Sequence, residues 1–592
     1  MLLTSSSEGI LLKQGDRVLQ VSESEVTIVT GKSLDGSKCQ EIDGILGLIE
    51  LKVGKYLISI NRSESVGKIL DNEIFKVVST SVVPLGNYST YNKDEHAYLD
   101  LIRFQLDSSN LYYSPTYDLT NSMQRNFVKN LTVTIGSLDK RFFWNEFLNK
   151  DLLNEYAKDK NYGAFITPVI SGYAKVLQEN VNGSDVSFAL VTRRNKFRAG
   201  TRYFRRGIDA KGNVANNNET EQLLMYKNTV QSYLQTRGSV PVYWSEINNL
   251  KYKPKLAISK TSPVEAATLH FDEQVSLYGD NYLVNLVNQK GYELPVKKAY
   301  ENIVEKLDND RLNYIYFDFH HECRKMQWHR VNLLIDRLKD LGMKRNDHFF
   351  GTIDKDGVTT LREQSHVVRT NCMDCLDRTN VVQSTLGRYF LQSQLEQLNL
   401  LKEGEKWESN KTFNLEFQNF WADNADAVSS VYSGTGALKT DFTRTGKRTR
   451  KGALNDLNNS LTRYVKNNYK DGARQDSFDL ILGEFVPAKV PYSPFTDNRL
   501  YQFRYILKLF LFFIFLLIAL FLKSLVYGLQ AKQHVLAAIA VVGMLFSAIY
   551  MFSNGLQVVD WPKLKPLDYL KKEPVYSKKK FIGNKFTRNT EY

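Results

Sequence analysis

The sequence predicts an α/β catalytic domain with a Cys-x5-Arg phosphate loop, preceded by a mostly β N-terminal domain and followed by a two-helix transmembrane hairpin. Three observations carry this prediction. Short apolar runs separated by turn residues fill the first part of the chain, a cysteine and an arginine enclose five residues between a strand-like and a helix-like pattern, and two long apolar runs stand near the end. A chain of 592 residues is long enough for two or three such units.

The N-terminal domain is expected to cover residues 1–165. Residues 18–29 alternate between apolar and polar side chains, and the apolar runs 45–51 and 56–60 flank a Val-Gly-Lys turn, a pattern typical of a β-hairpin. A further strand is expected over residues 74–78. No catalytic pattern is visible in this region, so we interpret it as a scaffold that packs on the catalytic domain.

The catalytic domain is expected to cover residues 166–488, where strand and helix patterns alternate. Residues 186–191 and 314–319 are mostly apolar and predict buried strands. Residues 198–207 are expected to form strand and turn, and a helix is expected to begin near Asp280, with another strand possible beside it. An alternation of this kind is typical of an α/β fold.

The Cys-x5-Arg loop runs from Cys372 to Arg378. Residues 366–368 predict a short strand that enters the loop, and apolar residues at near-helical spacing predict a helix that leaves it, with Thr379 or Asn380 as its cap. A loop of this length can turn its backbone N–H groups toward one anion, and a helix N-terminus also favours negative charge. Such surroundings are expected to lower the pKa of the Cys372 thiol from about 8.5 into the range of about 4–7.

The loop residues can be assigned roles in phosphoryl transfer. The Cys372 thiolate is the expected nucleophile, and the planar guanidinium of Arg378 is suited to bind two oxygens of a phosphate group. Asp374 and Asp377 are the candidates for the acid that protonates the leaving oxygen, and Asp374 is preferred. The other loop residues expected to bind substrate are Met373, Cys375, Leu376, Thr379 and Asn380.

Other interpretations of the cysteines stay open. Cys372 and Cys375 have the spacing of half a zinc site or of a redox pair, but the chain has four cysteines and the other two stand alone. They could also be plain structural cysteines. The string His320-His321-Glu322 suggests a metal site, although adjacent histidines point apart on a strand, and a polar network is the preferred interpretation. We expect no metal and no cofactor, because a thiolate and an arginine suffice for phosphoryl transfer.

The chain is basic, with a formal net charge of +14, which predicts anionic partners, either nucleic acid or an anionic membrane surface. Two basic stretches are candidates for contact with a phosphate group. A solvated charged surface is the simpler interpretation of such runs, but the first stretch is rich in arginine, which suits phosphate better than lysine does. The first contains Arg198, Arg202, Arg205 and Arg206, and the second contains Arg444, Lys447 and Arg448.

The C-terminal part is expected to contain a linker over residues 489–504, a transmembrane hairpin over 505–553 and a basic cytosolic tail over 554–592. The two apolar runs predict membrane spans at about 505–525 and 534–553, because each is long enough to cross ~30 Å of hydrocarbon. The tail is rich in lysine and the connector between the runs is not, which predicts that both chain ends are cytosolic. The small number of cysteines also favours a reducing compartment for the catalytic part.

The string from Arg369 to Asn380 resembles the signature of the Sac-domain phosphoinositide phosphatases. The strings at residues 117–122 and 198–207 are also similar to this family, and the resemblance extends from about residue 40 to residue 488. Asn371 stands where protein-tyrosine phosphatases usually carry histidine, which favours the lipid-phosphatase branch. With its apolar hairpin, the chain resembles the integral-membrane Sac lipid phosphatases of yeasts.

The resemblance implies hydrolysis of phosphatidylinositol 4-phosphate, and of other monophosphates, to phosphatidylinositol through a phosphocysteine intermediate. It also implies a multi-pass protein of the endoplasmic reticulum membrane, and of the Golgi, whose substrates are membrane phosphoinositides and which does not bind nucleic acid. Protein partners would be sought among lipid-metabolism complexes of the endoplasmic reticulum. One alternative is a catalytically weak membrane protein that binds anionic lipids as a regulator or scaffold, and phosphate release distinguishes it. Another alternative is a protein phosphatase, and the relative rates of phosphate release from a phosphotyrosine peptide and from inositol lipid distinguish it.

Overall fold

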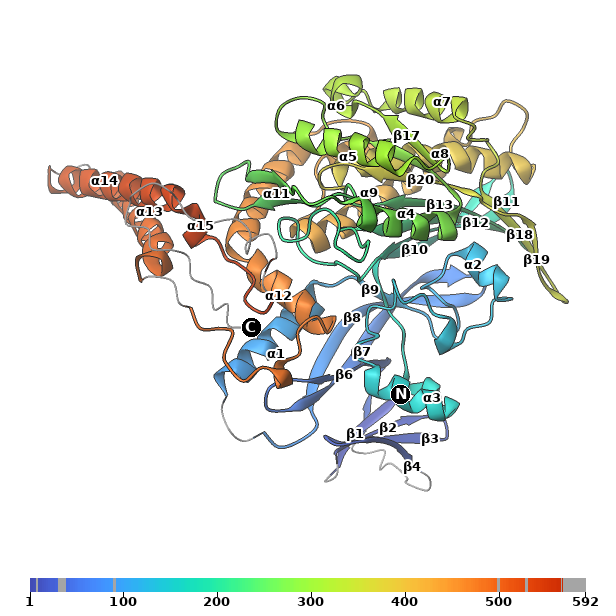
Figure 1. The fold of residues 1–592 in the computed structure, drawn as a ribbon, viewed down its shortest axis with the longest axis horizontal. Helices are drawn as coiled ribbons and strands as arrows, with labels where there is room; N and C mark the ends of the chain where they lie inside the picture. The colour runs from blue at the N-terminus through green and yellow to red at the C-terminus, as the bar shows by residue number, and fades with distance from the viewer. Residues whose placement is uncertain are drawn as a thin grey trace.

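The computed structural model describes residues 1–6, 9–29, 39–88, 92–497, 501–527, 531–565 and 567. These residues form a small five-stranded sheet, a large mixed sheet, a two-stranded sheet and helices around them, and two long helices project from one end (Figure 1). The N-terminus lies at the small sheet, far from the projecting helices in this view.

The small sheet confirms the β pattern expected near the N-terminus. The predicted hairpin over residues 45–60 is also present, where Glu50 pairs with Lys55 at the start of the large sheet. In the small sheet, Leu12, Leu19 and Val21 belong to one buried apolar cluster. Its strands are β1 (Leu2–Ser6), β2 (Gly9–Gln14), β3 (Arg17–Val21), β4 (Val26–Val29) and β5 (Gln40–Glu41), in the order β4-β3-β2-β1-β5.

The large sheet has 13 strands and continues across the boundary predicted at residue 165. β9 precedes that boundary and β10 follows it, and they pair through Tyr112 and Ile170, so one sheet connects both parts of the chain. The order is β17-β16-β20-β13-β12-β11-β10-β9-β8-β7-β6, with β18 on β13 and β19 on β18. Its strands are β6 (Gly44–Glu50), β7 (Lys55–Ile69), β8 (Asn72–Pro84), β9 (Leu111–Tyr113), β10 (Ile170–Val181), β11 (Ser184–Arg194), β12 (Asn218–Tyr226), β13 (Thr229–Arg237), β16 (Asp280–Asn285), β17 (Leu312–Tyr316), β18 (Phe349–Asp354), β19 (Gly357–Arg362) and β20 (His366–Asn371).

One end of the large sheet is parallel. β16 pairs in parallel with β17 and β20, and β20 pairs in parallel with β13. Parallel neighbours need long crossover connections, and helices supply them here. The helices before the C-terminal region are α1 (Lys93–Ser108), α2 (Met123–Val128), α3 (Lys150–Lys158), α4 (Val264–Tyr278), α5 (Leu294–Leu307), α6 (Phe319–Glu322), α7 (Asn332–Asp340), α8 (Asp377–Gln397), α9 (Lys411–Ser433), α10 (Thr440–Thr445), α11 (Arg450–Tyr469) and α12 (Asp471–Ile481).

Three local predictions in the catalytic part are wrong in whole or in part. Within residues 198–207, expected as strand and turn, the turn is present but no strand is. We call residues 202–206 the arginine turn; its arginines pair with acidic groups of three different segments. The helix expected from Asp280 is the strand β16, which is paired on both edges, and a strand buried on both faces lacks the alternation that would identify it. α8 begins at Asp377, so Thr379 and Asn380 lie within its first turn and do not cap it.

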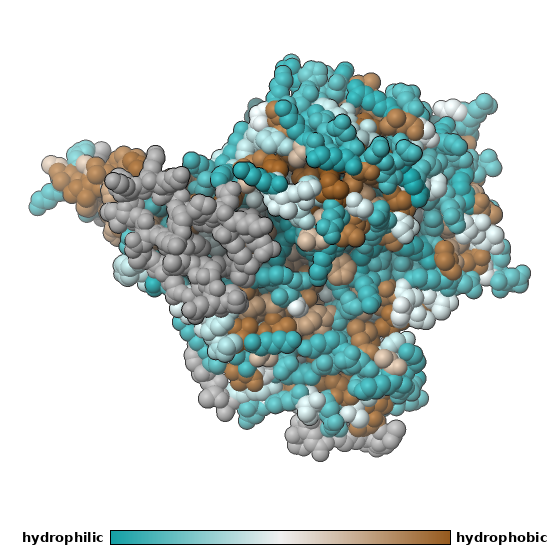
Figure 2. Space-filling model, in the orientation of Figure 1, coloured by the Kyte–Doolittle hydropathy of each residue, from teal (hydrophilic) through white to brown (hydrophobic). Residues whose placement is uncertain are grey.

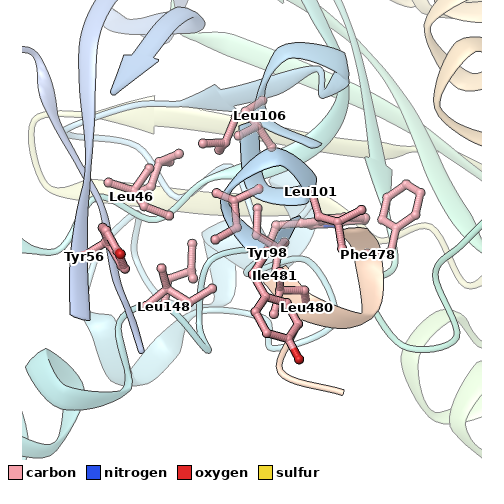
Figure 3. Packing of buried hydrophobic residues seen from close by; sticks show 14 of the residues in the cluster. Leu46, Tyr56, Tyr98, Leu101, Leu106, Leu148, Phe478, Leu480 and Ile481 are labelled. Atoms are coloured by element: carbon pink, nitrogen blue, oxygen red, sulfur yellow. The ribbon is translucent and has the colours of Figure 1, made fainter. Parts of the chain in front are cut away.

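The end of the predicted catalytic domain completes the core of the N-terminal part. Leu46 of β6, Tyr98 of α1, and Phe478 and Leu480 of α12 belong to one buried cluster (Figure 3). Burying an apolar side chain of this size contributes roughly 1.5–3 kcal/mol. The two predicted domains therefore share a core as well as a sheet.

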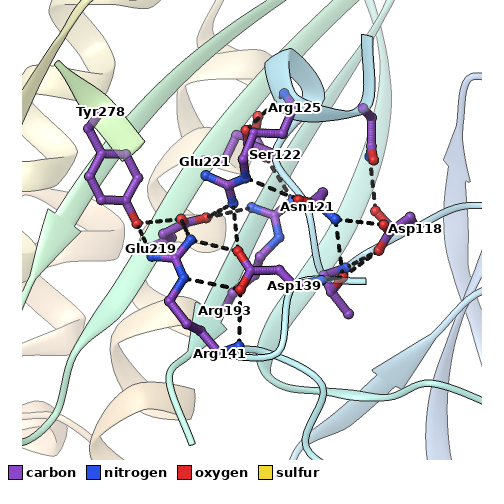
Figure 4. A network of polar contacts seen from close by, with 12 residues as sticks. Asp118, Asn121, Ser122, Arg125, Asp139, Arg141, Arg193, Glu219, Glu221 and Tyr278 are labelled. Atoms are coloured by element: carbon purple, nitrogen blue, oxygen red, sulfur yellow. Dashed lines mark hydrogen bonds and ion pairs between the residues drawn. The ribbon is translucent and has the colours of Figure 1, made fainter. Parts of the chain in front are cut away.

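A buried network of charges joins the segment before β10 to the large sheet and to α4 (Figure 4). The Glu219 carboxylate of β12 accepts hydrogen bonds from Arg125 at 2.8 Å and from Arg141 at 3.2 Å. The Tyr278 hydroxyl donates to the same carboxylate at 2.5 Å. Burial raises the pKa of Glu219, but the charges of Arg125 and Arg141 lower it more, to about 2. Glu219 is therefore ionised at neutral pH, and its carboxylate links α2, the segment before β10 and α4.

Both C-terminal apolar runs form helices, as predicted. α13 (Tyr501–Tyr527) and α14 (Ala531–Ser553) are long and apolar enough to cross a membrane by length and composition, and each begins a few residues before its predicted span. The most apolar window of α13 has no buried residue, and Figure 2 shows hydrophobic surface on the projecting end. α15 (Gly555–Val558) follows α14. Residues 566 and 568–592, which carry most of the lysines that predict the orientation, lie outside the described residues.

Candidate active site

Residues 372–378 lie at the carboxyl end of a parallel strand. Cys372 directly follows β20, and α8 begins at Asp377, so the predicted strand and the predicted helix are both present. Because β13 and β16 run parallel to β20, their carboxyl ends meet the same edge of the sheet. Sheets of this kind hold ligands at this edge, and the first turn of a helix adds unpaired N–H groups there.

A contact on the outer side of the loop turns one backbone N–H inward. The Asp374 carbonyl accepts from Nδ2 of Asn216 at 2.9 Å. In a trans peptide the N–H of the next residue points away from that carbonyl. The Cys375 N–H accordingly points at Sγ of Cys372, at a distance of 2.9 Å. Cys375 holds this orientation in the left-handed region, with a φ of 52°.

The two loop cysteines differ in acidity. Burial raises the pKa of the Cys372 thiol, but neighbouring groups lower it more, to about 6. Those groups are the side chains of Cys375, Arg378 and Thr379, and the Thr379 hydroxyl donates to Sγ at 3.5 Å. Burial raises the pKa of Cys375 well above its usual range, and its Sγ donates to the Gly238 carbonyl at 2.9 Å. At neutral pH Cys372 is therefore the thiolate and Cys375 the thiol.

Asp374 is held between two residues of the arginine turn. Arg202 donates to its carboxylate through Nε at 3.1 Å and pairs through Nη2 at 2.8 Å, and Arg206 donates through Nη2 at 2.5 Å. Arg206 also donates to the Met373 carbonyl at 2.8 Å. Burial raises the pKa of Asp374, but the two guanidinium groups lower it more, to well below its usual range. A carboxyl group held in its ionised form is a poor acid, so this geometry does not support the preference for Asp374 over Asp377.

Asp377 has the opposite electrostatic surroundings. Its Oδ1 accepts from the Leu438 N–H at 2.9 Å. Burial raises its pKa, against the opposing charge of Arg463. A carboxyl group with a raised pKa can carry a proton to a leaving group. Of the two loop aspartates, Asp377 is therefore the better proton donor.

Arg378 is anchored by a carboxylate that sequence reasoning missed. Its terminal nitrogens donate to both oxygens of Glu293, each at 3.0 Å, and Nη1 also donates to the Leu286 carbonyl at 2.9 Å. Bidentate pairing of this kind fixes the plane of a guanidinium group. The charge of Arg378 still lowers the pKa of Cys372, so the anchored arginine lies within electrostatic reach of the thiolate.

A pocket of about 220 Å³ is lined by Cys372, Arg378 and both loop aspartates. Its other walls include Trp328 and the segment between α9 and α10. Lys439 in that segment is exposed at the pocket and has a left-handed backbone (φ 60°) held by hydrogen bonds from its N–H to Asp456. The pocket lining therefore combines the Cys372 thiolate and the Arg378 guanidinium with two carboxyl groups and Lys439.

Of the predicted basic residues, only Arg202 and Arg206 contact the loop in the described part of the chain. The Lys447 side chain is exposed, and Lys447 is not among the residues that line the pocket. The others are used within the fold: Arg198 donates to the carbonyls of Arg206 and Gly207, Arg205 pairs with Asp479, Arg444 with Asp423 and Asp426, and Arg448 with Asp441 and Asp456. Because most of these arginines form ion pairs or hydrogen bonds within the fold, a run of arginines in the sequence did not identify the residues that line the pocket.

Of the remaining predicted loop residues, Leu376 and Asn380 also line the pocket, whereas Met373 is buried in an apolar cluster away from it. Nδ2 of Asn380 donates to the Trp421 carbonyl at 3.0 Å. A further missed residue is Arg237 at the end of β13, which is fully buried and whose Nε and Nη1 have no protein partner among the described residues. Burial lowers the pKa of Arg237 to about 10, and the charge of the Cys372 thiolate opposes this. Arg237 therefore lies within electrostatic reach of Cys372.

The histidine cluster forms a polar network near the surface. Glu322 pairs with Arg330 at 2.7 Å, and Nδ1 of His321 lies 3.6 Å from the same carboxylate group. Within the described ranges, no group of three or more His, Cys, Asp or Glu side chains is placed to hold a metal ion. Cys372 and Cys375 do not form a disulfide with each other here.

Comparisons with known proteins agree with the resemblance. Residues 43–324 match the SacI homology domain. Phosphatidylinositol-3-phosphatase SAC1 of Saccharomyces cerevisiae is 47% identical over 589 residues, which cover 98% of this chain and 93% of that protein. Phosphatidylinositol-3-phosphatase SAC1-B of Danio rerio is 42% identical, covering 78% and 79%. Phosphoinositide phosphatase SAC6 of Arabidopsis thaliana is 35% identical, covering 77% of each chain. The chain therefore belongs to the SacI homology family, together with the SAC1 phosphatidylinositol phosphatases.

Proposed function

We propose that this protein is a phosphoinositide phosphatase that removes phosphate from phosphatidylinositol monophosphates through a phosphocysteine intermediate. The observation that carries the proposal is the state of Cys372, whose pKa is lowered to about 6 beside an arginine in the wall of a pocket. The thiolate is the nucleophilic form of cysteine. The names of the relatives, phosphatidylinositol-3-phosphatase and phosphoinositide phosphatase, support the same class of reaction.

In the first step, Sγ of Cys372 attacks the phosphorus atom and the bond from phosphorus to the inositol oxygen breaks. Phosphocysteine forms, and the negative charge on the equatorial oxygens is stabilised by Arg378 and by the N–H groups of the loop. The bidentate pair with Glu293 holds the guanidinium in place before substrate arrives, so little reorganisation is needed.

The leaving inositol oxygen must take up a proton, and Asp377 is the proposed donor because burial raises its pKa. In the second step the resulting carboxylate accepts a proton from the water that attacks phosphocysteine. Water oxygen bonds to phosphorus, the bond from phosphorus to Sγ breaks, and inorganic phosphate and the Cys372 thiolate are released. Asp374 instead holds the arginine turn against the loop.

We propose the 4-phosphate of phosphatidylinositol as the principal substrate, whereas the SAC1 relatives are named for the 3-phosphate. The experiment measures phosphate release by the purified full-length protein from lipids phosphorylated at the 3-, 4- or 5-position, and from a phosphotyrosine peptide. Faster release from lipid than from peptide is expected, with the 4-phosphate fastest. Release is expected to persist in EDTA, because every step above uses side chains of the chain itself. No release from any lipid would refute the activity and favour a scaffold that binds anionic lipids.

The apolar helices suggest where the enzyme works. We propose that α13 and α14 span the endoplasmic reticulum or Golgi membrane as a hairpin with both chain ends in the cytosol. Outside a membrane, their exposed apolar side chains would face water. A cysteine introduced into the connector between them should react with a membrane-impermeant reagent only after the organelle membrane is permeabilised, whereas one at the C-terminus should react without permeabilisation.

A further inference from the structure

The chain that follows the second apolar helix returns to the catalytic part of the molecule. In Figure 1, α15 lies between the projecting helices and α12. We call residues 555–565 the return segment. It begins with a close approach, because a Cβ at Gly555 would lie 2.0 Å from the Asn249 carbonyl oxygen. Only glycine fits this contact, so the path of the return segment is specified at its first residue.

Backbone groups of the return segment are held by α12. The Lys563 and Leu564 N–H groups donate to Oδ1 of Asp476 at 2.8 and 2.9 Å. In the other direction, the Ala473 N–H in the first turn of α12 donates to the Asp560 carboxylate at 3.1 Å. Asp476 is only 2% exposed, burial raises its pKa to about 8, and a buried polar group is costly unless it is hydrogen-bonded. α12 therefore carries an internal acceptor that is satisfied when the return segment is in place.

Trp561 links the return segment to the arginine turn. Its ring centroid lies 5.5 Å from that of Phe204, the middle residue of the turn, and both side chains are buried. A Cβ at Gly472 of α12 would lie 2.6 Å from the Trp561 carbonyl, so the segment is pressed against the helix. The same apolar cluster includes Ile506 of α13 and Met551 of α14. One cluster thus joins the ends of both apolar helices to the arginine turn.

The arginine turn is held at four places. Its first and last residues bind Asp374 of the catalytic loop, Arg206 also pairs with Glu246, Arg205 donates to Asp479 of α12 at 2.8 Å, and Phe204 packs on Trp561. Phe204 lies two residues from each guanidinium group that holds Asp374. A shift of Phe204 would therefore move both guanidinium groups and the part of the loop that they hold.

We propose that the return segment positions the arginine turn, and through it the catalytic loop, with Trp561 as the positioning residue. The inference rests on the proposed phosphatase function. Trp561 does not line the pocket, so it acts through Phe204 and not on substrate. Losing the contact lets Asp374 move relative to Cys372, which slows phosphoryl transfer more than it weakens lipid binding. The position of the apolar helices relative to the catalytic part is thereby coupled to the geometry of the catalytic loop.

The test compares full-length protein in lipid nanodiscs with Trp561→Ala, Trp561→Phe and Lys563→Ala. Lys563 is the matched control, because its side chain is exposed and only its backbone N–H contacts α12. For Trp561→Ala we expect kcat on a short-chain phosphatidylinositol phosphate to fall by about 3- to 10-fold with little change in KM. Trp561→Phe should recover most of the rate, and Lys563→Ala should match the wild type.

Hydrogen–deuterium exchange gives the second readout. In Trp561→Ala, exchange in peptides covering 555–565 and 202–206 should rise together. Asp476→Ala removes the acceptor at the other end of the return segment and should give the same paired rise in exchange, which tests the proposal independently if Trp561→Ala does not fold. A released return segment with unchanged exchange in the arginine turn and unchanged kcat would overturn the proposal. A wild-type protein that releases no phosphate would refute the proposed function, while the exchange data would still test the positioning.

Discussion

Replacing Thr379 with valine is expected to raise the pKa of Cys372. The Thr379 hydroxyl donates to Sγ at 3.5 Å, and valine keeps the shape of threonine without the donor. A hydrogen bond to a charged group stabilises it by about 1.5–3 kcal/mol. Because this bond is long, we assign it about 1 kcal/mol of stabilisation of the thiolate. Since 1.36 kcal/mol corresponds to one pKa unit, the pKa should rise from about 6 to roughly 6.7.

The assay is the rate of Cys372 alkylation by iodoacetamide as a function of pH, followed by loss of activity. The wild-type midpoint should lie near pH 6 and the Thr379→Val midpoint near 6.7, and the two rates should converge above about pH 8. Thr385→Val is the matched control on the same helix, because its hydroxyl bonds the Val381 carbonyl at 2.9 Å. A wild-type midpoint at the ordinary value for cysteine, or an unchanged midpoint in Thr379→Val, would refute the reasoning.

Three further predictions concern the arginine, the acid and the buried network. Arg378→Lys should lower kcat/KM nearly as much as Arg378→Ala, by about 10²-fold or more, because lysine cannot make bidentate bonds; a lysine variant that keeps most of the rate of phosphate release would show that charge alone matters. Asp377→Asn should slow release from inositol lipid by about 10²-fold but hardly affect p-nitrophenyl phosphate, whose leaving group needs no proton, and equal losses on both substrates would exclude the donor role. Glu219→Gln should lower Tm at pH 7 and weaken the acid dependence of Tm. The pKa of Glu219 is lowered to about 2 in the fold, so its stabilisation is complete above about pH 5 and is lost as the pH falls toward 2; an unaltered pH profile in thermal melts would contradict this.

Features contiguous in the sequence could be predicted. The strand before Cys372, the helix after Arg378 and the two apolar helices are all present, because each depends on a local pattern of apolar residues. The β-rich start of the chain was predictable for the same reason. Prediction from the local pattern fails at β16, because a central strand that is buried on both faces shows no alternation of apolar and polar residues.

The partners that set the chemistry of the loop could not be read from the sequence. Glu293 and Arg378 are 85 residues apart, and Asn216 and Asp374 are 158 apart, so only the folded sheet brings them together. The choice between Asp374 and Asp377 depended on such partners, since both are loop aspartates with the same intrinsic acidity. The strand expected within residues 198–207 is absent for a related reason, because tertiary ion pairs override the local preference of residues 202–206.

The central claim is that Cys372 becomes covalently phosphorylated during turnover. The direct measurement mixes full-length protein with phosphatidylinositol 4-phosphate, quenches the reaction with acid, and maps the modified peptide by mass spectrometry. We predict that one phosphoryl group is found on Cys372 in the wild type and in Cys375→Ser, and that Cys372→Ser shows neither the adduct nor phosphate release. Phosphate release by Cys372→Ser, or turnover by the wild type with the phosphoryl group on Cys375 or on no residue, would contradict the account.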